Sequence, residues 1–451
     1  MQIIIVGCGN VGITLTEQLS KEGHNITVVD TNGTRVEAVA NQFDVMGVVG
    51  NGASFTVQNE AGIEEADLLI AVTTSDELNL LCCLIARKAG GCNTIARVRN
   101  PIYNREIAYI KEELGLSMVI NPEFAAASEI ARLLKFPSAI KVDSFAKGRV
   151  ELLKCKLGEG SVLDGKPLTY ISSGLHCDVL ICMVERGEEV FIPSGNFELQ
   201  EKDVISVIAT SRKANEFFRK IGMTTNRIKS CIIVGGGETT YYLAKQLLPM
   251  GIDIKIIEQS KERCNELSEL LPQAMVIHGD GTERNLLYEE GLPQTHSFVS
   301  WTNMDEENIM LSLFAKSVSS AKTITKVHRI DYYEIIDKLD LGSVLYPKFI
   351  TAEYILQYVR AMQNSLGSNI ETLYQLIEDK VEALEFRVHE EAKLVGIPLK
   401  ELQLKDNLLI ACINRKGKVI TPGGQDTIEA GDTVVVVTSN QGFHDLRDIL
   451  K

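Results

Sequence analysis

The sequence predicts a mixed α/β protein with two doubly wound parallel sheets, each followed by a small α+β lobe. Three observations support this fold class. Short apolar strands alternate with helical patterns, this plan occurs twice along the chain, and a segment with period-two strands follows each copy. With 451 residues, of which 45% are hydrophobic, the chain is too long for one ordinary core. We therefore expect a tandem duplication.

The duplication is visible as matching segments in the same order. The stretch IIIVGCGNVG near the start matches CIIVGGGETT, so that Gly7 aligns with Gly235 at an offset of 228 residues (235 − 7 = 228). Asp30 aligns with Glu258 at the same offset (258 − 30 = 228), and the segment GNGAS aligns with GDGTE. Further along, VTTSDELN answers WTNMDEEN. Agreement of this kind at a fixed period indicates an internal repeat.

Each α/β unit is expected to form a parallel sheet wrapped by helices on both faces. In the first unit the predicted strands cover residues 2–6, 25–30, 45–49, 67–72, 94–98 and 117–121. The segment NPEFAAASEIARLLKFP follows the last strand, and its helical face is predicted to present Phe124, Ala127, Ala131 and Leu134. Its counterpart is PKFITAEYILQYVRAM. We expect both helices to leave one lobe and pack against another.

The segments behind the two α/β units also repeat. Period-two strands are separated there by the turn signals PSGNF and PGGQD, which is typical of a small α+β lobe. The expected domains are a first α/β unit at 1–122 with a crossover helix at 123–137, a first lobe at 138–223, a second α/β unit at 228–347 with a crossover helix at 348–365, and a second lobe at 370–451.

A glycine-rich turn follows the first predicted strand. Gly7, Gly9 and Gly12 form a G-x-G-x-x-G pattern that opens a helix, which is the context of a Rossmann-like dinucleotide site. Gly7 permits the sharp turn, Gly9 lets the backbone approach a pyrophosphate, and Gly12 lets the helix lie close to the strand. Asp30 ends the second strand, where it can accept hydrogen bonds from a ribose and would repel a 2′-phosphate, so NAD(H) is favoured over NADP(H). A tight turn without a ligand is the alternative.

Two further strand ends are expected at the same crevice. Thr73 and Thr74 close the fourth strand, although Thr74 or Ser75 could equally cap the next helix. Arg97 closes the fifth strand and could pair with phosphate or with a surface carboxylate; Lys326 keeps a cation at this position in the second unit. The polar side chains that follow are predicted to cap helices: Asp76 and Asn79.

The second glycine turn departs from the first. Gly235 and Gly237 are kept, but Thr240 stands where the third glycine should be, and Glu238 places a carboxylate where a pyrophosphate would lie. Glu258 can still accept from a ribose. We therefore expect weaker nucleotide binding or a different ligand in this crevice.

The overall composition excludes several classes of function. Sixty acidic against 46 basic residues give a net charge of −14, which disfavours nonspecific binding to nucleic acid or to an anionic lipid surface. The ten cysteines show no C-x-x-C spacing, so reduced core thiols are favoured over disulfides or a zinc framework. No signal peptide and no membrane-spanning apolar run are seen, so the chain is expected to be cytoplasmic, with any membrane role supplied by a partner.

The sequence gives little support to catalysis. A dehydrogenase needs an acid or base beside the nicotinamide. None of the histidines lies in a recognisable catalytic context: His24, His176, His278, His296, His328, His389 and His444. The adjacent pair His176 and Cys177 has poor spacing for a metal, and no metal site is predicted. The chain is expected not to be an enzyme, with a nicotinamide-dependent oxidoreductase as the alternative.

Taken together, the motifs resemble one known family. The order IIIVGCGNVG, VVD, GNGAS, AVTTSDELN, ARVRNP and VINPE, followed by a β-rich lobe with IPSG, is similar to the RCK family, also called KTN. The tandem form resembles the peripheral, NAD-binding subunits of Trk potassium-uptake systems, and the likeness covers essentially the whole sequence. It implies a regulator on the inner face of the cell membrane, bound to an integral-membrane potassium transporter or channel, with several lobes assembled as a dimer or tetramer into a gating ring.

The resemblance also implies a ligand and its contacts. In this family the α/β lobes bind NAD(H) or ATP/ADP, and crossover helices pair the lobes. Carried over to this sequence, the expected contacts are Gly7, Cys8, Gly9, Asn10, Val11, Asp30, Thr73, Thr74 and Arg97 in the first unit, and Gly235, Gly237 and Glu258 in the second.

Overall fold

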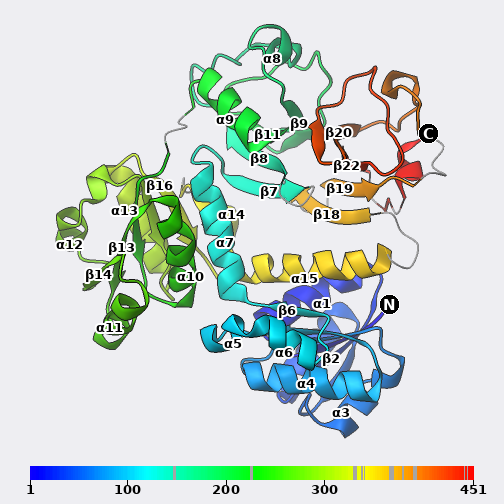
Figure 1. The fold of residues 1–451 in the computed structure, drawn as a ribbon, viewed down its shortest axis with the longest axis vertical. Coiled ribbons are helices and arrows are strands. Elements are labelled where there is room, and N and C mark those ends of the chain that lie inside the picture. Colours follow the sequence, from blue (N-terminus) through cyan, green and yellow to red (C-terminus); the bar gives the residue numbers. More distant parts are fainter. Residues whose placement is uncertain are drawn as a thin grey trace. The chain divides into compact units, whose positions relative to one another are not determined.

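The computed structural model describes residues 1–145, 149–223, 227–328, 333–336, 339, 341–364, 370–377, 380–389, 394–440, 442–443 and 445–451. The chain divides into two compact units, each assembled from two separate segments (Figure 1). One unit combines Met1–Ala131 with Lys229–Leu356, and the other combines Arg132–Ile228 with Gln357–Lys451. The two α/β repeats therefore share one unit, and the two β-rich lobes share the other.

The first repeat is built on a six-stranded parallel sheet in the order β3-β2-β1-β4-β5-β6. Its strands are β1 (Gln2–Val6), β2 (Asn25–Asp30), β3 (Met46–Val49), β4 (Leu68–Ala71), β5 (Asn93–Arg97) and β6 (Met118–Ile120). Its helices are α1 (Asn10–Lys21), α2 (Gly33–Phe43), α3 (Phe55–Glu60), α4 (Asp76–Ala89), α5 (Pro101–Arg105) and α6 (Ile107–Glu113). Each predicted strand lies within one residue of the observed bounds.

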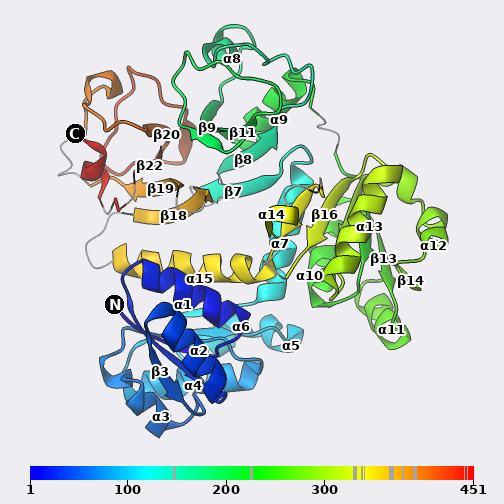
Figure 2. The same ribbon diagram turned by 180° about the vertical axis from the view of Figure 1, so that it is seen from behind.

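Both faces of this sheet are covered, which explains the nearly continuous apolar character of its central strands. All four residues of β4 and the last four of β1 are buried. Helices α3 to α6 cover the face turned to the viewer in Figure 1, and α1 and α2 cover the opposite face, seen in Figure 2. A strand order of 3-2-1-4-5-6 with helices on both faces is the doubly wound Rossmann arrangement.

The second repeat has the same topology, with a sheet in the order β14-β13-β12-β15-β16-β17. Its strands are β12 (Ser230–Val234), β13 (Asp253–Glu258), β14 (Met275–His278), β15 (Ser297–Ser300), β16 (Lys322–Lys326) and β17 (Ser343–Leu345). Its helices are α10 (Glu238–Leu247), α11 (Lys261–Leu270), α12 (Arg284–Glu289), α13 (Asp305–Val318) and α14 (Tyr333–Ile336). The two matching sheets confirm the predicted duplication.

A long helix follows the last strand of each sheet: α7 (Pro122–Lys135) and α15 (Pro347–Asn364). The start of α7 contacts α10 of the other repeat. Asn121 Nδ2 donates to Tyr242 Oη at 3.2 Å, and Gln246 Nε2 donates to Ser128 Oγ at 3.2 Å. The two repeats are therefore joined by polar contacts as well as by the chain.

The predicted apolar face of α7 is partly wrong. Phe124 was expected among the packed residues, but its side chain is 46% exposed, and its ring forms an edge contact with the Tyr242 ring, with 5.7 Å between centroids. The buried side chains of α7 include the predicted Ala127 and Leu134, together with Ala125, Ala126, Ile130 and Leu133. Three consecutive alanines leave room for close packing on that side, so Phe124 is turned outward.

The other unit contains two five-stranded antiparallel sheets with equivalent strand orders, β10-β9-β11-β8-β7 and β18-β19-β22-β20-β21. The first is formed by β7 (Lys141–Phe145), β8 (Val150–Lys156), β9 (Leu180–Arg186), β10 (Glu189–Phe191) and β11 (Val204–Ala209), with helices α8 (Thr169–Ser173) and α9 (Ser211–Lys220). The second is formed by β18 (Ile370–Ile377), β19 (Val381–Arg387), β20 (Leu408–Arg415), β21 (Lys418–Ile420) and β22 (Thr433–Thr438).

The two lobes have one common hydrophobic core, and each has an equivalent arginine–aspartate ion pair. Apolar side chains of both lobes, among them Phe145 and Val435, form one buried cluster. Arg186 pairs with buried Asp203 at 2.8 Å, and Arg415 pairs with buried Asp432 at 2.9 Å, at equivalent positions. The α+β lobes are thus also duplicated, as predicted.

All ten cysteines are free and buried, which confirms the prediction of reduced core thiols. Burial raises the pKa of Cys155 and Cys182 to about 12, so these thiols are inert at neutral pH. Among the described residues, no helix has the length and apolar character needed to cross a bilayer.

Candidate functional site

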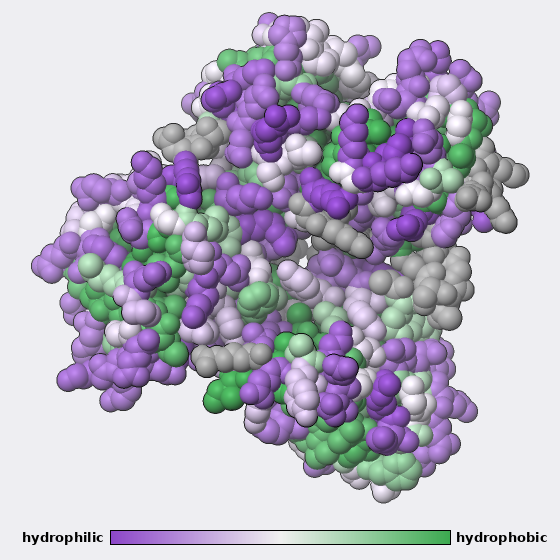
Figure 3. Space-filling model, in the orientation of Figure 1, coloured by the Kyte–Doolittle hydropathy of each residue, from purple (hydrophilic) through white to green (hydrophobic). Residues whose placement is uncertain are grey.

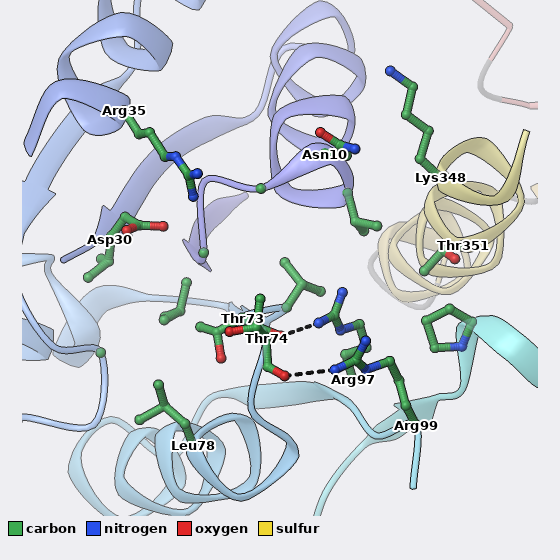
Figure 4. Close-up of a pocket in the computed structure, with 18 of the residues that line it drawn as sticks. Asn10, Asp30, Arg35, Thr73, Thr74, Leu78, Arg97, Arg99, Lys348 and Thr351 are labelled. Atoms are coloured by element: carbon green, nitrogen blue, oxygen red, sulfur yellow. Dashed lines mark hydrogen bonds between the residues drawn. The ribbon is translucent and has the colours of Figure 1, made fainter. Parts of the chain in front are cut away.

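A cavity of about 450 Å³ opens at the carboxyl ends of the strands of the first sheet. Its walls are formed by the loops that follow β1 to β5 and by the start of α1, together with residues of the second repeat (Figure 4). Ligands of open α/β sheets bind in this crevice, where the strand order reverses between β1 and β4.

The glycine turn shows why each of its positions lacks a side chain. Gly7 has φ +110°, and a Cβ there would lie 3.0 Å from the backbone nitrogen of Thr73. A Cβ on Gly12 would lie 1.9 Å from the carbonyl oxygen of Gly7, so this glycine sets the closeness of α1 to β1. A Cβ on Gly9 would meet nothing within 4 Å, because this residue faces the cavity. Gly9 is the N-cap of α1 and supplies no side-chain cap.

Asp30 holds this turn in place. Its Oδ2 accepts from the backbone nitrogen of Cys8 at 2.7 Å, and its Oδ1 accepts from that of Asn32 at 2.9 Å. Each carboxylate oxygen retains a lone pair for a further donor, so Asp30 can still accept from a ribose hydroxyl. Cys8 itself does not line the cavity; its side chain is buried, and burial, with the Asp30 charge, raises the pKa of this thiol to about 11.

The ends of β4 and β5 are fixed by one buried amide. Asn79 Oδ1 accepts from the backbone nitrogen of Thr73 at 2.8 Å and from its hydroxyl at 2.7 Å, while Nδ2 donates to the carbonyl of Arg97 at 2.9 Å. Asp76 Oδ2 accepts from the backbone nitrogens of Arg99 and Asn100 at 2.9 and 2.8 Å. The prediction that these two residues cap a helix is wrong, since they order the loops around the cavity.

The cap of α4 is Ser75, whose Oγ accepts from the backbone nitrogen of Leu78 at 3.2 Å. Of the two residues expected as possible caps, Ser75 and not Thr74 caps α4. Thr73 and Thr74 both line the cavity.

Two arginines bring positive charge to the far side of the cavity. Arg97 Nη2 donates to the carbonyl of Thr73, and Arg99 Nη2 donates to the carbonyl of Thr74 at 2.9 Å (Figure 4). Burial and the neighbouring Arg99 lower the pKa of Arg97. Within the described chain its Nε has no hydrogen-bond partner. Arg97 therefore places a partly desolvated positive charge on the cavity wall.

The second repeat completes the wall with His328, Lys348 and Thr351. The backbone nitrogen of His328 donates to Asp305 at 2.9 Å, and its Nδ1 lies 3.4 Å from the same carboxylate. Burial, reinforced by Lys326, lowers the pKa of His328, so its imidazole is neutral at pH 7. A ligand in the cavity would therefore contact both repeats.

Residues of opposite charge lie in the first turns of the two long helices α7 and α15. Glu123 follows Pro122 at the start of α7, and Lys348 follows Pro347 at the start of α15; all four residues line the cavity. Burial raises the pKa of Glu123.

In the second repeat, side chains of the chain itself contact the equivalent glycine turn. Glu258 accepts from the backbone nitrogen of Gly236 at 2.6 Å, as Asp30 does in the first repeat. Thr240 Oγ1 donates to the carbonyl of Gly235 at 2.6 Å, where Gly12 would leave space. The guanidinium of Arg263 donates from Nε to the carbonyl of Gly236 at 2.7 Å and pairs with Glu238 at 3.1 Å.

The cavity gathers most of the residues that sequence reasoning selected in the first repeat: Gly7, Gly9, Asn10, Val11, Asp30, Thr73, Thr74 and Arg97. It does not include Cys8, Gly235, Gly237 or Glu258. Sequence reasoning missed Arg35, Arg99, Glu123, His328, Lys348 and Thr351. Arg99 was available in ARVRN, where it alternates with Arg97 beyond the strand, but no local signal marks the residues from the second repeat.

Comparison with known proteins agrees with this architecture. The TrkA-N domain model matches residues 3–122 and 231–347, and the TrkA-C domain model matches residues 155–222 and 383–451. The chain is 31% identical over 451 residues to a Trk system potassium uptake protein TrkA homolog of Archaeoglobus fulgidus, with all of both chains covered. It is 31% identical over 442 residues to the Trk system potassium uptake protein TrkA of Halomonas elongata, covering 97% of this chain and 95% of the relative.

The solved structure of the GsuK RCK domain has the same fold. It superposes with a TM-score of 0.63 at 17% identity, over 97% of this chain and 92% of that chain. The GsuK channel bound to NAD gives a TM-score of 0.62 at 17% identity, over 97% of this chain and 77% of that chain. With two TrkA-N and two TrkA-C domains in alternation and relatives aligned over nearly their full lengths, this chain belongs to the TrkA family.

Proposed function

We propose that this protein is a nucleotide-sensing regulatory subunit of a potassium-uptake system. The observation that carries this proposal is the composite wall of the cavity. The glycine turn, Asp30 and Arg97 come from the first repeat, whereas His328 and Lys348 come from the second. The names of the full-length relatives support the potassium-uptake role.

The mechanism follows from this composite wall. A nucleotide that contacts both repeats binds most tightly to one arrangement of them, and it shifts the equilibrium towards that arrangement by the difference in binding free energy. Coupling between sites is usually about 1 to 3 kcal/mol, and several identical sites that move together give a steep response. The nucleotide acts as a signal, and none of its bonds is made or broken.

NAD(H) is the proposed ligand, with ATP or ADP as the second candidate. The proposed contacts in the first repeat are the backbone from Gly7 to Val11 for the diphosphate, Asp30 for the ribose, and Thr73, Thr74 and Arg97 for the phosphate side. The crevice with Gly235, Gly237 and Glu258 is proposed as a weaker site, because Arg263 already forms an ion pair with Glu238 there.

Assembly into a homo-oligomeric ring on the inner face of the cell membrane is part of the proposal. Leu81 in α4 and Met310 in α13 stand at equivalent positions (310 − 81 = 229) and are 46% and 65% exposed. Ile102 in α5 is 68% exposed, and the apolar colour in Figure 3 gathers over this part of the first repeat. Exposed apolar side chains repeated in both copies support contacts with further copies of the chain. The membrane partner would be an integral potassium transporter or channel.

The alternative is a nicotinamide-dependent oxidoreductase, and one observation favours it. His328 lines the cavity, and its Nδ1 lies 3.4 Å from Oδ1 of Asp305, a contact that often orients an acid or base. Steady oxidation of NADH with a small metabolite, abolished in His328→Gln, would establish this alternative.

Affinity purification from native membranes tests the regulatory role. We expect the wild-type chain to be recovered with an integral potassium-transporting protein and with an intact nucleotide that mass spectrometry identifies. Gly9→Glu should retain the membrane protein and lose the nucleotide. Recovery from membranes without any potassium-transporting partner would contradict the proposal.

A further inference from the structure

Arg35, in the first turn of α2, lines the cavity although no sequence motif marks it as a ligand contact. Figure 4 shows Arg35 and Arg97 extending towards the glycine turn from opposite sides. The positive charge of Arg35 lowers the pKa of the Cys8 thiol, against the larger opposing effects of burial and of Asp30. Within the described chain, the backbone nitrogen of Arg35 donates to Oδ1 and to the carbonyl oxygen of Asn32, each at 3.1 Å, whereas its guanidinium has no hydrogen-bond acceptor.

The second repeat shows what this arginine can do. Arg263 is the equivalent residue (263 − 35 = 228), and Ser260 caps its helix as Asn32 caps α2 (260 − 32 = 228). Arg263 Nε donates to the carbonyl of Gly236 at 2.7 Å, and its Nη2 lies 3.1 Å from Oε1 of Glu238. The guanidinium is thereby fixed over the glycine turn, against an anion at the start of α10.

The position of that anion is informative. Glu238 is the first residue of α10 and stands where Asn10 begins α1 (238 − 10 = 228). The N-terminus of such a helix, with its free backbone N–H groups, is where a bound diphosphate lies in this fold. Carboxylate and phosphate oxygens are both bound by guanidinium groups through charge-assisted contacts. In the first repeat the neutral Asn10 leaves this anion to be supplied by a ligand.

We infer that Arg35 binds the diphosphate of the nucleotide, making the contact that Arg263 makes to Glu238, and that Glu238 is an internal substitute for the ligand phosphate. This inference rests on the proposed nucleotide binding in the first crevice. A bound diphosphate would lie between Arg35 and Arg97, over the first N–H groups of α1. Arg35 would thus bind the ligand in the first repeat, whereas Arg263 binds Glu238 of its own chain in the second.

Two features argue against a role for Arg35 on the ribose side. The structure shows no ion pair between Arg35 and Asp30, although both line the cavity and both are described. In the second repeat the acceptors of Arg263 are the turn carbonyl and Glu238, together with Glu266 at 2.7 Å, and not the ribose-side Glu258. The contacts of Arg263 therefore favour binding of Arg35 to the phosphates and not to the ribose.

Isothermal titration of the full chain with ADP and with adenosine tests the inference. For Arg35→Gln we expect ADP affinity to fall about ten- to hundredfold, the usual effect of one charge-assisted contact, and adenosine affinity to stay within about twofold of wild type. Arg35→Lys keeps the charge without the fork and should lie between. Arg263→Gln is the matched control and should leave the ADP affinity of the first crevice unchanged.

The outcomes separate the inference from the proposed function. Wild-type protein that binds neither ADP nor NADH would overturn both. Wild-type protein that binds ADP, with Arg35→Gln binding it equally well, would overturn the inference alone. Equal loss of ADP and adenosine by Arg35→Gln at an unchanged melting temperature would place Arg35 on the nucleoside and would also overturn it.

Discussion

The side chain of Asn79 links two strand ends, because its amide donates to the Arg97 carbonyl at 2.9 Å while its oxygen accepts from Thr73. The second repeat has the same device, in which Asn308 donates to the carbonyl of Lys326 at 3.2 Å. Both amides are fully buried. The geometry of the cavity wall thus depends on a residue that need not touch the ligand.

Asn79→Ala should weaken nucleotide binding about tenfold and lower the free energy of unfolding by about 1 to 3 kcal/mol, because buried backbone groups lose their partners. Asn308→Ala is the matched control, with a similar loss of stability and no effect on the first crevice. Chemical denaturation and titration with NADH measure the two effects. Unchanged affinity in Asn79→Ala would show that the strand ends keep their positions without it.

Gly9→Glu should abolish binding in the first crevice and leave the fold intact. A Cβ at Gly9 meets nothing within 4 Å, so the new carboxylate projects into the cavity and repels the phosphates. A Cβ at Gly237 would also meet nothing within 4 Å, and Gly237→Glu should spare the first crevice. Titration with NADH and circular dichroism provide the two measurements, and nucleotide affinity equal to wild type would disprove the site assignment.

Gly12→Ala should behave differently from Gly9→Glu. Its Cβ would lie 1.9 Å from the Gly7 carbonyl oxygen, so α1 must move away from β1. We expect a loss of about 1 to 3 kcal/mol in the free energy of unfolding from this overpacking, together with weaker binding. A thermal melt as stable as wild type would show that the helix adjusts freely, as α10 does around Thr240.

Combining Thr240→Gly with Glu238→Asn should strengthen diphosphate binding in the second crevice. The change removes the carboxylate that pairs with Arg263 at 3.1 Å and restores the third glycine. Titration with ADP should then show a second equivalent, and adding Arg263→Gln should remove it. If the stoichiometry does not change in the double variant, competition by Glu238 is not what limits this crevice.

Lys326 should make stability depend on pH in the alkaline range. Burial lowers its pKa to about 8 against the opposing effects of Asp305 and Glu123, whereas the unfolded chain keeps a value near 10.5. Between these values the unfolded state binds more protons, so stability rises with pH, by at most about 1.4 kcal/mol per pH unit. Compared with Lys326→Met, wild type should therefore gain stability from pH 8 to 10. Parallel curves in urea denaturation would contradict this.

Strands and the glycine turn could be predicted from the sequence because their signals are local. Buried parallel strands such as β4 are short apolar runs, and the turn at Gly7 needs a positive φ that few other residues adopt. The repeat strengthens both predictions, since each signal occurs twice at an offset of 228 or 229 residues.

Long-range parts of the site could not be predicted in this way. His328 and Thr351 reach the cavity from the second repeat, and no periodicity links them to Gly7. Asp76 and Asn79 follow a strand and begin a helix, which is also the local pattern of a cap. Only the fold shows that their side chains form hydrogen bonds with distant loops, Asp76 as acceptor and Asn79 as donor. Phe124 was misplaced because three alanines, and not the largest side chain, define the packed side of α7.

Glu123 and Lys348 face one cavity from the starts of two helices that match in sequence as Pro-Glu-Phe and Pro-Lys-Phe. In a pair of identical chains, one gene change alters both positions at once, so like charges would meet across the symmetry axis. Covalent duplication removes that constraint. Each half can then mutate alone, so an acidic side chain in one repeat can face a basic one in the other.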